Sequence, residues 1–186
     1  MASSSAPQTA WIVLLRGVNV GGSRRVTSAD LREAAGAAGL DGARTYANSG
    51  NLVAVGAATD TDVAERVAGA LAAQLGGDLR AVALSGRRAA AVLAADPFPD
   101  AVADRPARVQ AHLSPAPVDG DALARLAEGK PERFAVVDGV LYVDYVDGIG
   151  RSRLTPAAID RAAGTWTTAR NWKTLTRLVE MAREAT

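Results

Sequence analysis

The order of apolar segments over residues 10–84 is the feature that most restricts the fold of this chain. Residues 10–15 (AWIVLL) have the composition of a buried strand, and Thr27 with Asp30 fits a capping box that opens a helix. Two short extended pieces flank a turn at Asn48-Ser49-Gly50, a second helix follows, and residues 79–84 (LRAVAL) form another strand. The predicted order is therefore strand, helix, strand, strand, helix, strand, which is a split βαβ arrangement.

The second part of the chain is predicted to resemble this order without repeating the sequence. Asp138-Gly139 is a two-residue turn between strands rich in Val and Tyr, and Thr155-Pro156 is a helix cap followed by Pro at the first helical position. The other predicted elements are a helix over 86–95, a strand over 107–113, a helix over 119–128 and a last helix over 168–183. We predict an α+β fold in which two ferredoxin-like (split βαβ) halves pack in one compact unit.

The domain boundaries are predicted from composition. The start, MASSSAPQT, is small and polar, and three prolines between positions 97 and 106 predict a stiff, non-helical connection. The predicted parts are a disordered tail over 1–9, a first half over 10–95, a Pro-rich connection over 96–106 and a second half over 107–186 with C-terminal helices.

Cysteine is absent from the 186 residues, and histidine occurs once, at His112. The absence of Cys excludes disulfides, thiolate nucleophiles, Cys-ligated zinc and iron–sulfur clusters, and a single His argues against a His-rich metal site. We therefore expect no metal and no cofactor. His112 alternates with Arg108 and Gln110 along its strand, which predicts a half-exposed surface residue rather than a general base.

The net charge is +1, and Lys occurs only at positions 130 and 173, so nearly all of the 21 basic residues are Arg. Arginine forms forked hydrogen bonds with phosphate and carboxylate groups, but a nearly neutral chain has no overall field that attracts nucleic acid. No apolar run approaches the roughly 20 residues of a membrane span, and the start has no signal-peptide features. We expect a cytoplasmic protein with no membrane partner.

A Gly-containing loop with three arginines follows the first predicted strand. Glycines let backbone amides approach an anion, the next helix N-terminus adds partial positive charge, and arginine adds forked donors. The candidate ligand-binding residues of this loop are Arg16, Asn19, Gly21, Gly22 and Arg24. The pattern is neither a Walker A loop nor G-x-G-x-x-G. On residue content alone, an ordinary β-to-α turn is favoured, in which Asn19 bonds loop backbone groups.

Tyr46, Ser49 and Asn51 form a polar cluster between two strand pieces and are also candidate ligand-binding residues. They could present a hydroxyl, an amide and free N–H groups to a ligand. The alternative is a turn stabilised by Ser and Asn side chains. Ser49 is not a persuasive nucleophile, because the G-x-S-x-G pattern is absent.

Two further basic segments lie in the second half. Residues 148–155 (GIGRSRLT) place Arg151 and Arg153 before a capped helix, and Arg170 with Lys173 share one side of the last predicted helix. These four are candidate ligand-binding residues. Trp172 is predicted to belong to the core, and Asp144 is predicted to serve turn formation and solubility at the end of the hairpin.

Five segments together resemble the DUF1697 family, a group of small bacterial proteins of unknown function. They are LLRGVNVGG (14–22), RTYANSGNLV (44–53), Pro-Phe (97–98), GIGRSRLT (148–155) and TTARNWKTLTRLVEMA (167–182), and they occur in family order over about residues 11–182. The departures, at Ala54, Asp147, Arg153 and Ala169, are mild. The resemblance implies an α+β fold of two ferredoxin-like halves, and it implies no activity.

Three hypotheses of function follow. The first is a protein that binds a phosphate-bearing small molecule or nucleotide, with the Gly/Arg segments converging on one cleft. The second is a nucleic-acid-binding module on a ferredoxin-like sheet, although no stacking aromatic pair is evident. The third is a non-catalytic interaction or oligomerisation module, in which the strands over 133–145 leave an edge for pairing. The sequence identifies no catalytic residue and no oligomeric state.

Overall fold

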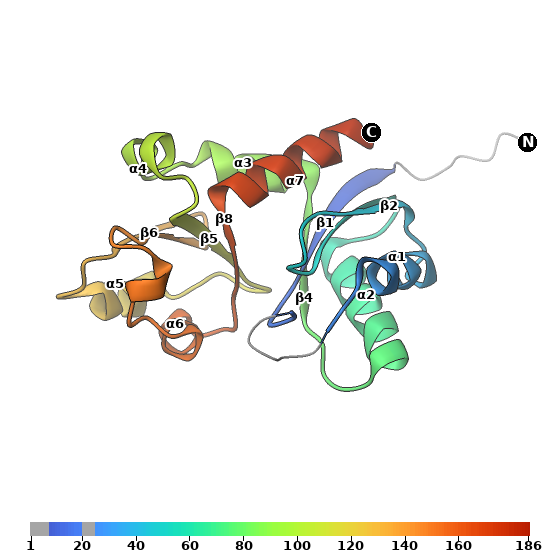
Figure 1. Cartoon of the computed structure of the whole chain (residues 1–186), viewed down its shortest axis with the longest axis horizontal. Coiled ribbons are helices and arrows are strands. Elements are labelled where there is room, and N and C mark those ends of the chain that lie inside the picture. The colour runs from blue at the N-terminus through green and yellow to red at the C-terminus, as the bar shows by residue number, and fades with distance from the viewer. Residues whose placement is uncertain (1–7, 20–24) are drawn as a thin grey trace, which may run out of the picture. The chain divides into compact units, whose positions relative to one another are not determined.

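The computed structural model describes residues 8–19 and 25–186 (Figure 1). The chain divides into two compact units. Unit 1 is formed by the chain up to residue 90 together with residues 177–186, and unit 2 spans residues 91–176. An α+β fold with two halves, as predicted, is therefore confirmed. The predicted tail over 1–9 lies outside the described residues except for Gln8 and Thr9, and Thr9 is already the first residue of a strand.

Unit 1 has the predicted order of strands and helices. Its elements are β1 (Thr9–Leu15), α1 (Ser28–Ala37), β2 (Asp41–Thr45), β3 (Asn51–Gly56), α2 (Asp60–Leu75) and β4 (Ala81–Ser85). The strands form an antiparallel sheet in the order β2-β3-β1-β4. The predicted capping box is present, because the Thr27 hydroxyl accepts from the Asp30 N–H while the Asp30 carboxylate accepts from the Thr27 N–H.

Helices α1 and α2 cover one face of the unit 1 sheet. Alternate residues of β1, namely Trp11, Val13 and Leu15, point to that face and pack in one cluster with the apolar stripes of both helices. Ile12 and Leu14, which point to the opposite face, are also fully buried. Burial on both faces explains why residues 10–15 are continuously apolar rather than alternating.

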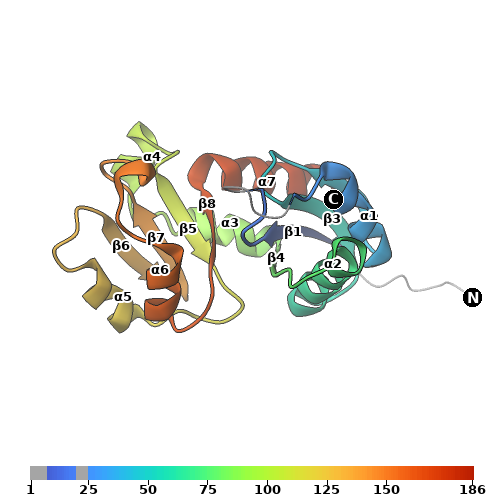
Figure 2. The ribbon, with the colours of Figure 1, turned by 60° about the horizontal axis from the view of Figure 1, so that its bottom comes forward.

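Unit 2 has the same order of strands and helices, preceded by extra helical segments. It contains the end of α3 (Gly86–Ala94), then α4 (Pro99–Asp104), β5 (Val109–Leu113), α5 (Gly120–Ala127), β6 (Arg133–Val137), β7 (Val140–Asp144), the short 3₁₀ helix η1 (Ile149–Arg151), α6 (Pro156–Ala163), β8 (Thr168–Asn171) and the start of α7 (Trp172–Glu184). Its sheet is also antiparallel, in the order β6-β7-β5-β8 (Figure 2). The two sheet orders therefore correspond strand for strand.

Two sequence predictions in unit 2 are wrong. The last helix begins at Trp172, because residues 168–171 pair with β5 as strand β8. The connection over 96–106 was predicted to be non-helical, but it contains helix α4. Pro99 is tolerated in the first turn of α4 because the N–H groups of that turn have no partner within a helix. The strand was missed because its pairing with β5 joins residues almost sixty positions apart, which a local pattern does not indicate.

Both faces of the unit 2 sheet are also buried. Leu141 and Val143 of β7 pack with Leu123 of α5 and Ile159 of α6. On the opposite face, the Tyr142 hydroxyl donates to the Val92 carbonyl at the end of α3, and its ring lies 6.3 Å from that of Trp172. Trp172 is 7% exposed, so its predicted place in the core is confirmed.

The described part of the chain contains no helix with both the length and the apolar character needed to cross a membrane. Within the same residues, no three acidic or histidine side chains gather as a metal site would require.

Candidate functional site

The first two motif segments meet in unit 1, and the contacts between them are mostly structural. Asn19 has a φ of +57°, and its side chain links two segments of unit 1. Its amide donates to the carbonyls of Val26 and Asn48, and its side-chain oxygen accepts from the Val26 N–H. The Leu15 N–H donates to the Gly50 carbonyl at 2.8 Å. These bonds pair described backbone groups on both sides of the β-to-α connection, as the turn interpretation of Asn19 predicts.

The polar cluster at residues 46–51 is likewise used by the protein itself. Asn51 is fully buried, and its amide donates to the Tyr46 carbonyl while the Tyr46 N–H donates to the Asn51 carbonyl. Ser49 is exposed at the turn, and Arg16 is half-buried, with its N–H bonded to the Arg80 carbonyl. The other candidates of the first loop, Gly21, Gly22 and Arg24, lie outside the described residues.

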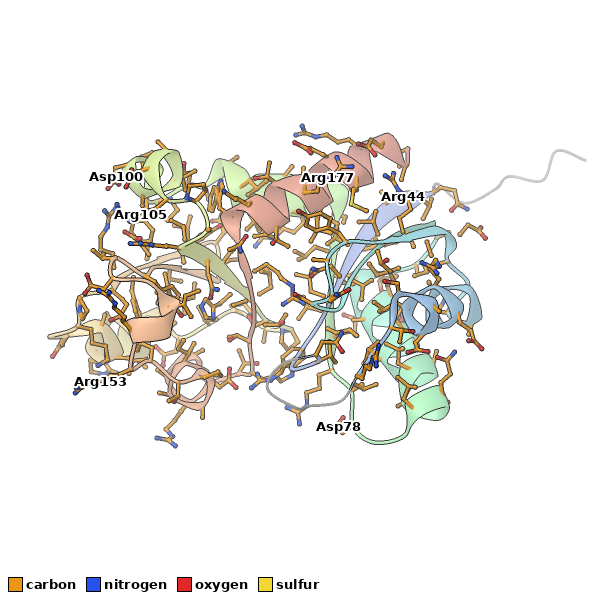
Figure 3. All side chains as sticks on the ribbon, viewed as in Figure 1. Arg44, Asp78, Asp100, Arg105, Arg153 and Arg177 are labelled. Carbon is orange, nitrogen blue, oxygen red and sulfur yellow. The ribbon has the colours of Figure 1, made fainter. Side chains whose placement is uncertain are left out.

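The four candidates in unit 2 differ in exposure. Arg151 and Arg153 are exposed on either side of Ser152, and Figure 3 shows Arg153 extending from the surface. Arg170 belongs to β8 rather than to a helix and is 8% exposed. Its guanidinium donates to the Thr168 hydroxyl and the Ala169 carbonyl, and burial lowers its pKa to about 10. Lys173 is exposed in the first turn of α7, so the predicted shared helix face does not exist.

His112 is buried, which corrects its prediction as a half-exposed surface residue. It is 4% exposed, since β5 is an inner strand of the sheet and both faces of that sheet are covered. Its Nδ1 lies 3.3 Å from the Thr167 hydroxyl, which in turn donates to the Asp160 carboxylate. The Nε2 atom is buried without a hydrogen-bond partner among the described residues.

The burial of His112 predicts a loss of stability in mild acid. Desolvation lowers its pKa from 6.5 to about 4, although the Asp160 carboxylate partly opposes this. The unfolded chain therefore binds a proton that the folded chain excludes, and stability falls as the pH drops from about 6.5 towards 4. Between pH 7.5 and pH 5 we expect this group to remove about 2 kcal/mol from the free energy of unfolding.

Urea unfolding of the wild-type protein and of His112→Gln at both pH values checks this prediction. His112 is the only histidine of the chain, so the variant should lose most of the pH dependence in this range. An equal loss in both proteins would show that His112 is not its source.

A cluster of ion pairs surrounds a buried carboxylate at the open end of the β6–β7 hairpin in unit 2, where sequence analysis predicted turn formation and solubility as the roles of Asp144. The Asp144 side chain is fully buried, and Arg105 reaches its two oxygens with Nε at 3.3 Å and Nη2 at 2.8 Å. This carboxylate raises the pKa of Arg105. Arg133 approaches Asp144 at 3.6 Å and pairs with Asp100 at 2.6 and 2.9 Å, which lowers the pKa of Asp100 to about 2.

The cluster joins the segment around α4 to the β6–β7 hairpin. The Arg133 guanidinium lies 4.6 Å from the centre of the Phe98 ring, which is 6% exposed. Each cation of the cluster has at least one carboxylate partner. Because both cations are paired with carboxylates of the protein, we assign this cluster to folding rather than to ligand binding.

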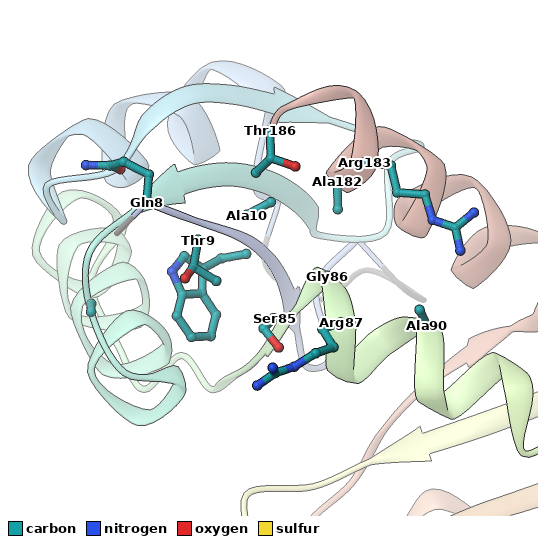
Figure 4. Close-up of a pocket in the computed structure, with 12 residues that line it drawn as sticks. Gln8, Thr9, Ala10, Ser85, Gly86, Arg87, Ala90, Ala182, Arg183 and Thr186 are labelled. Atoms are coloured by element: carbon teal, nitrogen blue, oxygen red, sulfur yellow. The ribbon is translucent and has the colours of Figure 1, made fainter. Parts of the chain in front are cut away.

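A pocket of about 590 Å³ lies wholly within unit 1. Its walls come from the start of β1, the start of α3 and the end of α7. Figure 4 shows Ser85, Gly86 and Arg87 along one wall, with Ala182 and Arg183 of α7 across from them. Trp11 also lines the pocket, and its indole N–H donates to the Gly56 carbonyl.

The first turn of α3 and two arginines line the pocket. The Ser85 hydroxyl caps the helix by accepting from the Arg88 N–H at 3.1 Å. Arg87 and Arg183 form no ion pair or side-chain hydrogen bond with any residue in the described ranges, whereas Arg44 and Arg177 of the same unit both bind Glu184. The pocket is therefore positive and its guanidinium donors are available.

Sequence analysis missed these residues, although a signal was present. Ser85-Gly86-Arg87-Arg88 follows a predicted strand and opens a predicted helix. This is the same strand, Gly/Arg, helix pattern that marked the loop after the first strand. Arg183 carried no such signal, because only the folding of α7 onto unit 1 brings it to the pocket.

Comparison with known proteins gives a family and a fold. A family model described as "Protein of unknown function (DUF1697)" matches residues 8–142. Among curated proteins no match was found. The structure of the conserved bacterial protein SP0830 from Streptococcus pneumoniae is similar to this chain, with a TM-score of 0.69 and 22% sequence identity over 95% of this chain and 99% of that chain. At this identity the likeness shows the fold alone.

Proposed function

Because the chain belongs to the DUF1697 family, which is described as being of unknown function, we propose a function from the geometry of unit 1: its pocket binds a phosphate-bearing small molecule. One observation carries the proposal. Arg87 and Arg183 reach the same pocket from different helices, and neither has a carboxylate partner among the described residues.

The chemistry of the pocket favours an anion over a neutral ligand. Two guanidinium groups supply forked donors for oxyanions, and the N-terminus of α3 adds a partial positive charge and backbone N–H groups that have no partner within the helix. Phosphate oxygens match this donor set, and their charge would balance that of the two arginines.

The size of the pocket favours a small molecule over a polymer. Its volume of about 590 Å³ falls within the roughly 300–1,000 Å³ that is usual for small-ligand sites. The apolar residues in the lining, among them Trp11, Ala90 and Ala182, would suit an uncharged organic group attached to the phosphate. A sugar phosphate or a mononucleotide meets both requirements.

The proposal keeps the predicted kind of ligand but moves the site. Asn19 and Asn51 form hydrogen bonds with backbone groups of the loop, and the two candidates of the first loop that the structure describes, Arg16 and Asn19, do not line this pocket. The strand, Gly/Arg, helix pattern that supports anion binding is the one at residues 85–88.

Isothermal titration with inorganic phosphate, glucose 6-phosphate, AMP and uncharged glucose tests the proposal. We expect at least one phosphate compound to bind and glucose not to bind. Arg87→Ala and Arg183→Ala should each weaken binding about tenfold or more, because each removes a charge-assisted hydrogen bond.

The matched control is Arg32→Ala, which removes an exposed arginine of α1 in the same unit, away from the pocket. Equal weakening by Arg32→Ala would indicate a general charge effect. Absence of binding by every phosphate probe would overturn the proposed function.

A further inference from the structure

Strand β6 lies at one edge of the unit 2 sheet, and its hairpin determines which backbone groups face outward. Asp138 and Gly139 have φ values of +50° and +75°, as a type I′ turn requires. In such a two-residue hairpin the flanking residues, Val137 and Val140, exchange both of their backbone hydrogen bonds. Because hydrogen-bonded and non-hydrogen-bonded pairs alternate along the two strands, the backbone N–H and C=O groups of Arg133, Ala135 and Val137 point towards β7.

The N–H and C=O groups of Phe134 and Val136 consequently point away from β7. Strand β6 pairs with β7 only, and no hydrogen bond between described residues uses these outward groups. Val136 is 36% exposed, which makes it one of the three large apolar side chains exposed among the described residues. Figure 2 shows β6 at the outer side of its sheet. The strand therefore offers an open pairing edge.

The corresponding edge strand of unit 1 is protected. Strand β2 has a register irregularity between Asp41 and Arg44, and Arg44 is bound to Glu184 at 2.9 Å. Irregular backbone and paired charges are common devices that keep an edge strand from pairing. Strand β6 has no such irregularity, since its register with β7 is continuous from Arg133 to Val137, and its one paired charge, Arg133, lies at the first position of the strand.

We propose that β6 pairs with β6 of a second copy of this chain, antiparallel and about a two-fold axis at Ala135. In this register Phe134 of each copy lies opposite Val136 of the other, and the two residues exchange their outward backbone hydrogen bonds. The pairing also sets an aromatic ring beside a β-branched side chain, which is a favourable cross-strand pair.

The sequence of β6 is compatible with a second copy as the occupant, because its central residues, Phe134, Ala135 and Val136, are uncharged. The strand has one charged residue, Arg133, which would lie opposite Val137 of the other copy and is already neutralised by Asp100. The two-fold arrangement therefore brings no like charges directly opposite each other within the strands. The contact is a short strand edge, well below about 1,200 Å², so the dimer should be weak and depend on concentration.

Sedimentation velocity over a range of concentrations tests the proposal. We expect a monomer at about 10 µM and substantial dimer by about 1 mM, as a small interface implies. Val136→Pro removes one outward N–H while leaving the β6–β7 bonds intact, because proline is tolerated on edge strands. It should weaken dimerisation about tenfold or more.

Val136→Thr is the matched control, since it keeps the N–H and the branched side chain and should still dimerise. Far-ultraviolet circular dichroism checks that both variants are folded. If Val136→Pro fails to fold, amide exchange in the wild-type protein decides: the amides of Phe134 and Val136 should become more protected as concentration rises. A monomer at every concentration, or a dimer that Val136→Pro leaves unchanged, would overturn the proposal. This test uses no residue of the anion pocket.

Discussion

Replacing Arg105 with alanine is expected to lower the free energy of unfolding by about 3 to 5 kcal/mol, because it leaves a buried carboxylate without its main partner. Asp144 is fully buried, and Arg105 binds both of its oxygens. The other cation, Arg133, is 3.6 Å away and is shared with Asp100. Chemical denaturation at neutral pH measures the effect.

Asp104→Ala is the control for this experiment. Asp104 pairs with the same arginine at 3.2 Å, but its side chain is 76% exposed. Exposed pairs contribute about 0 to 1 kcal/mol, so this variant should stay close to the wild-type protein. If both variants lose the same small amount, the buried pair does not stabilise unit 2 in the way inferred here.

Gly50→Ala is expected to destabilise the protein by about 2 to 5 kcal/mol, through backbone strain and a steric clash together. Gly50 has a φ of +68°, and a Cβ atom there would lie 2.6 Å from Val18 Cγ2 and 2.7 Å from Leu15 Cβ. The Leu15 atom is the first of its side chain, so rotation cannot relieve the contact. The clash falls where the two motif segments of unit 1 pack together.

Gly42→Ala separates the two contributions to this effect. Gly42 has a similar φ of +62°, but a Cβ atom there would have nothing within 4 Å. It should therefore show only the backbone strain, about 1 to 2 kcal/mol. Thermal and urea unfolding of both variants give the comparison. Equal losses would mean that the close packing at Gly50 adds nothing.

The features that the sequence predicted correctly are those decided by neighbouring residues. The capping box at Thr27, the two-residue turn at Asp138-Gly139 and the Pro-initiated helix α6 each depend on groups a few positions apart. The order of strands and helices in unit 1 followed from such local signals combined with the spacing of apolar residues. These local preferences agree with the folded structure, which is why the sequence alone predicts them.

The features that were missed depend on contacts between distant parts of the chain. His112 has polar neighbours in sequence, but the inner position of β5 buries it. Asp144 has the sequence context of a surface turn, but Arg105 lies almost forty residues earlier in the chain. Pairing with β5 likewise makes residues 168–171 a strand although a helical pattern begins nearby.

Only one of the two walls of the candidate pocket has a pattern that the sequence alone shows. One wall has a recognisable pattern, because Ser85, Gly86 and Arg87 join a strand to a helix. The other wall is supplied by Ala182, Arg183 and Thr186, which lie about a hundred positions later. Composition indicated that arginine would dominate the recognition chemistry, but it did not indicate which arginines lack carboxylate partners in the folded protein.

The division of the chain into units also restricts the order in which they can be completed during translation. Unit 2 consists of one continuous stretch, residues 91–176, whereas unit 1 needs residues 177–186 in addition to its sheet. Leu178, Val179 and Met181 of that segment are buried in the finished protein. The ribosome therefore makes the sheet of unit 1 first but supplies its last buried residues only after all of unit 2. The unit that is translated first is thus the second that can be completed.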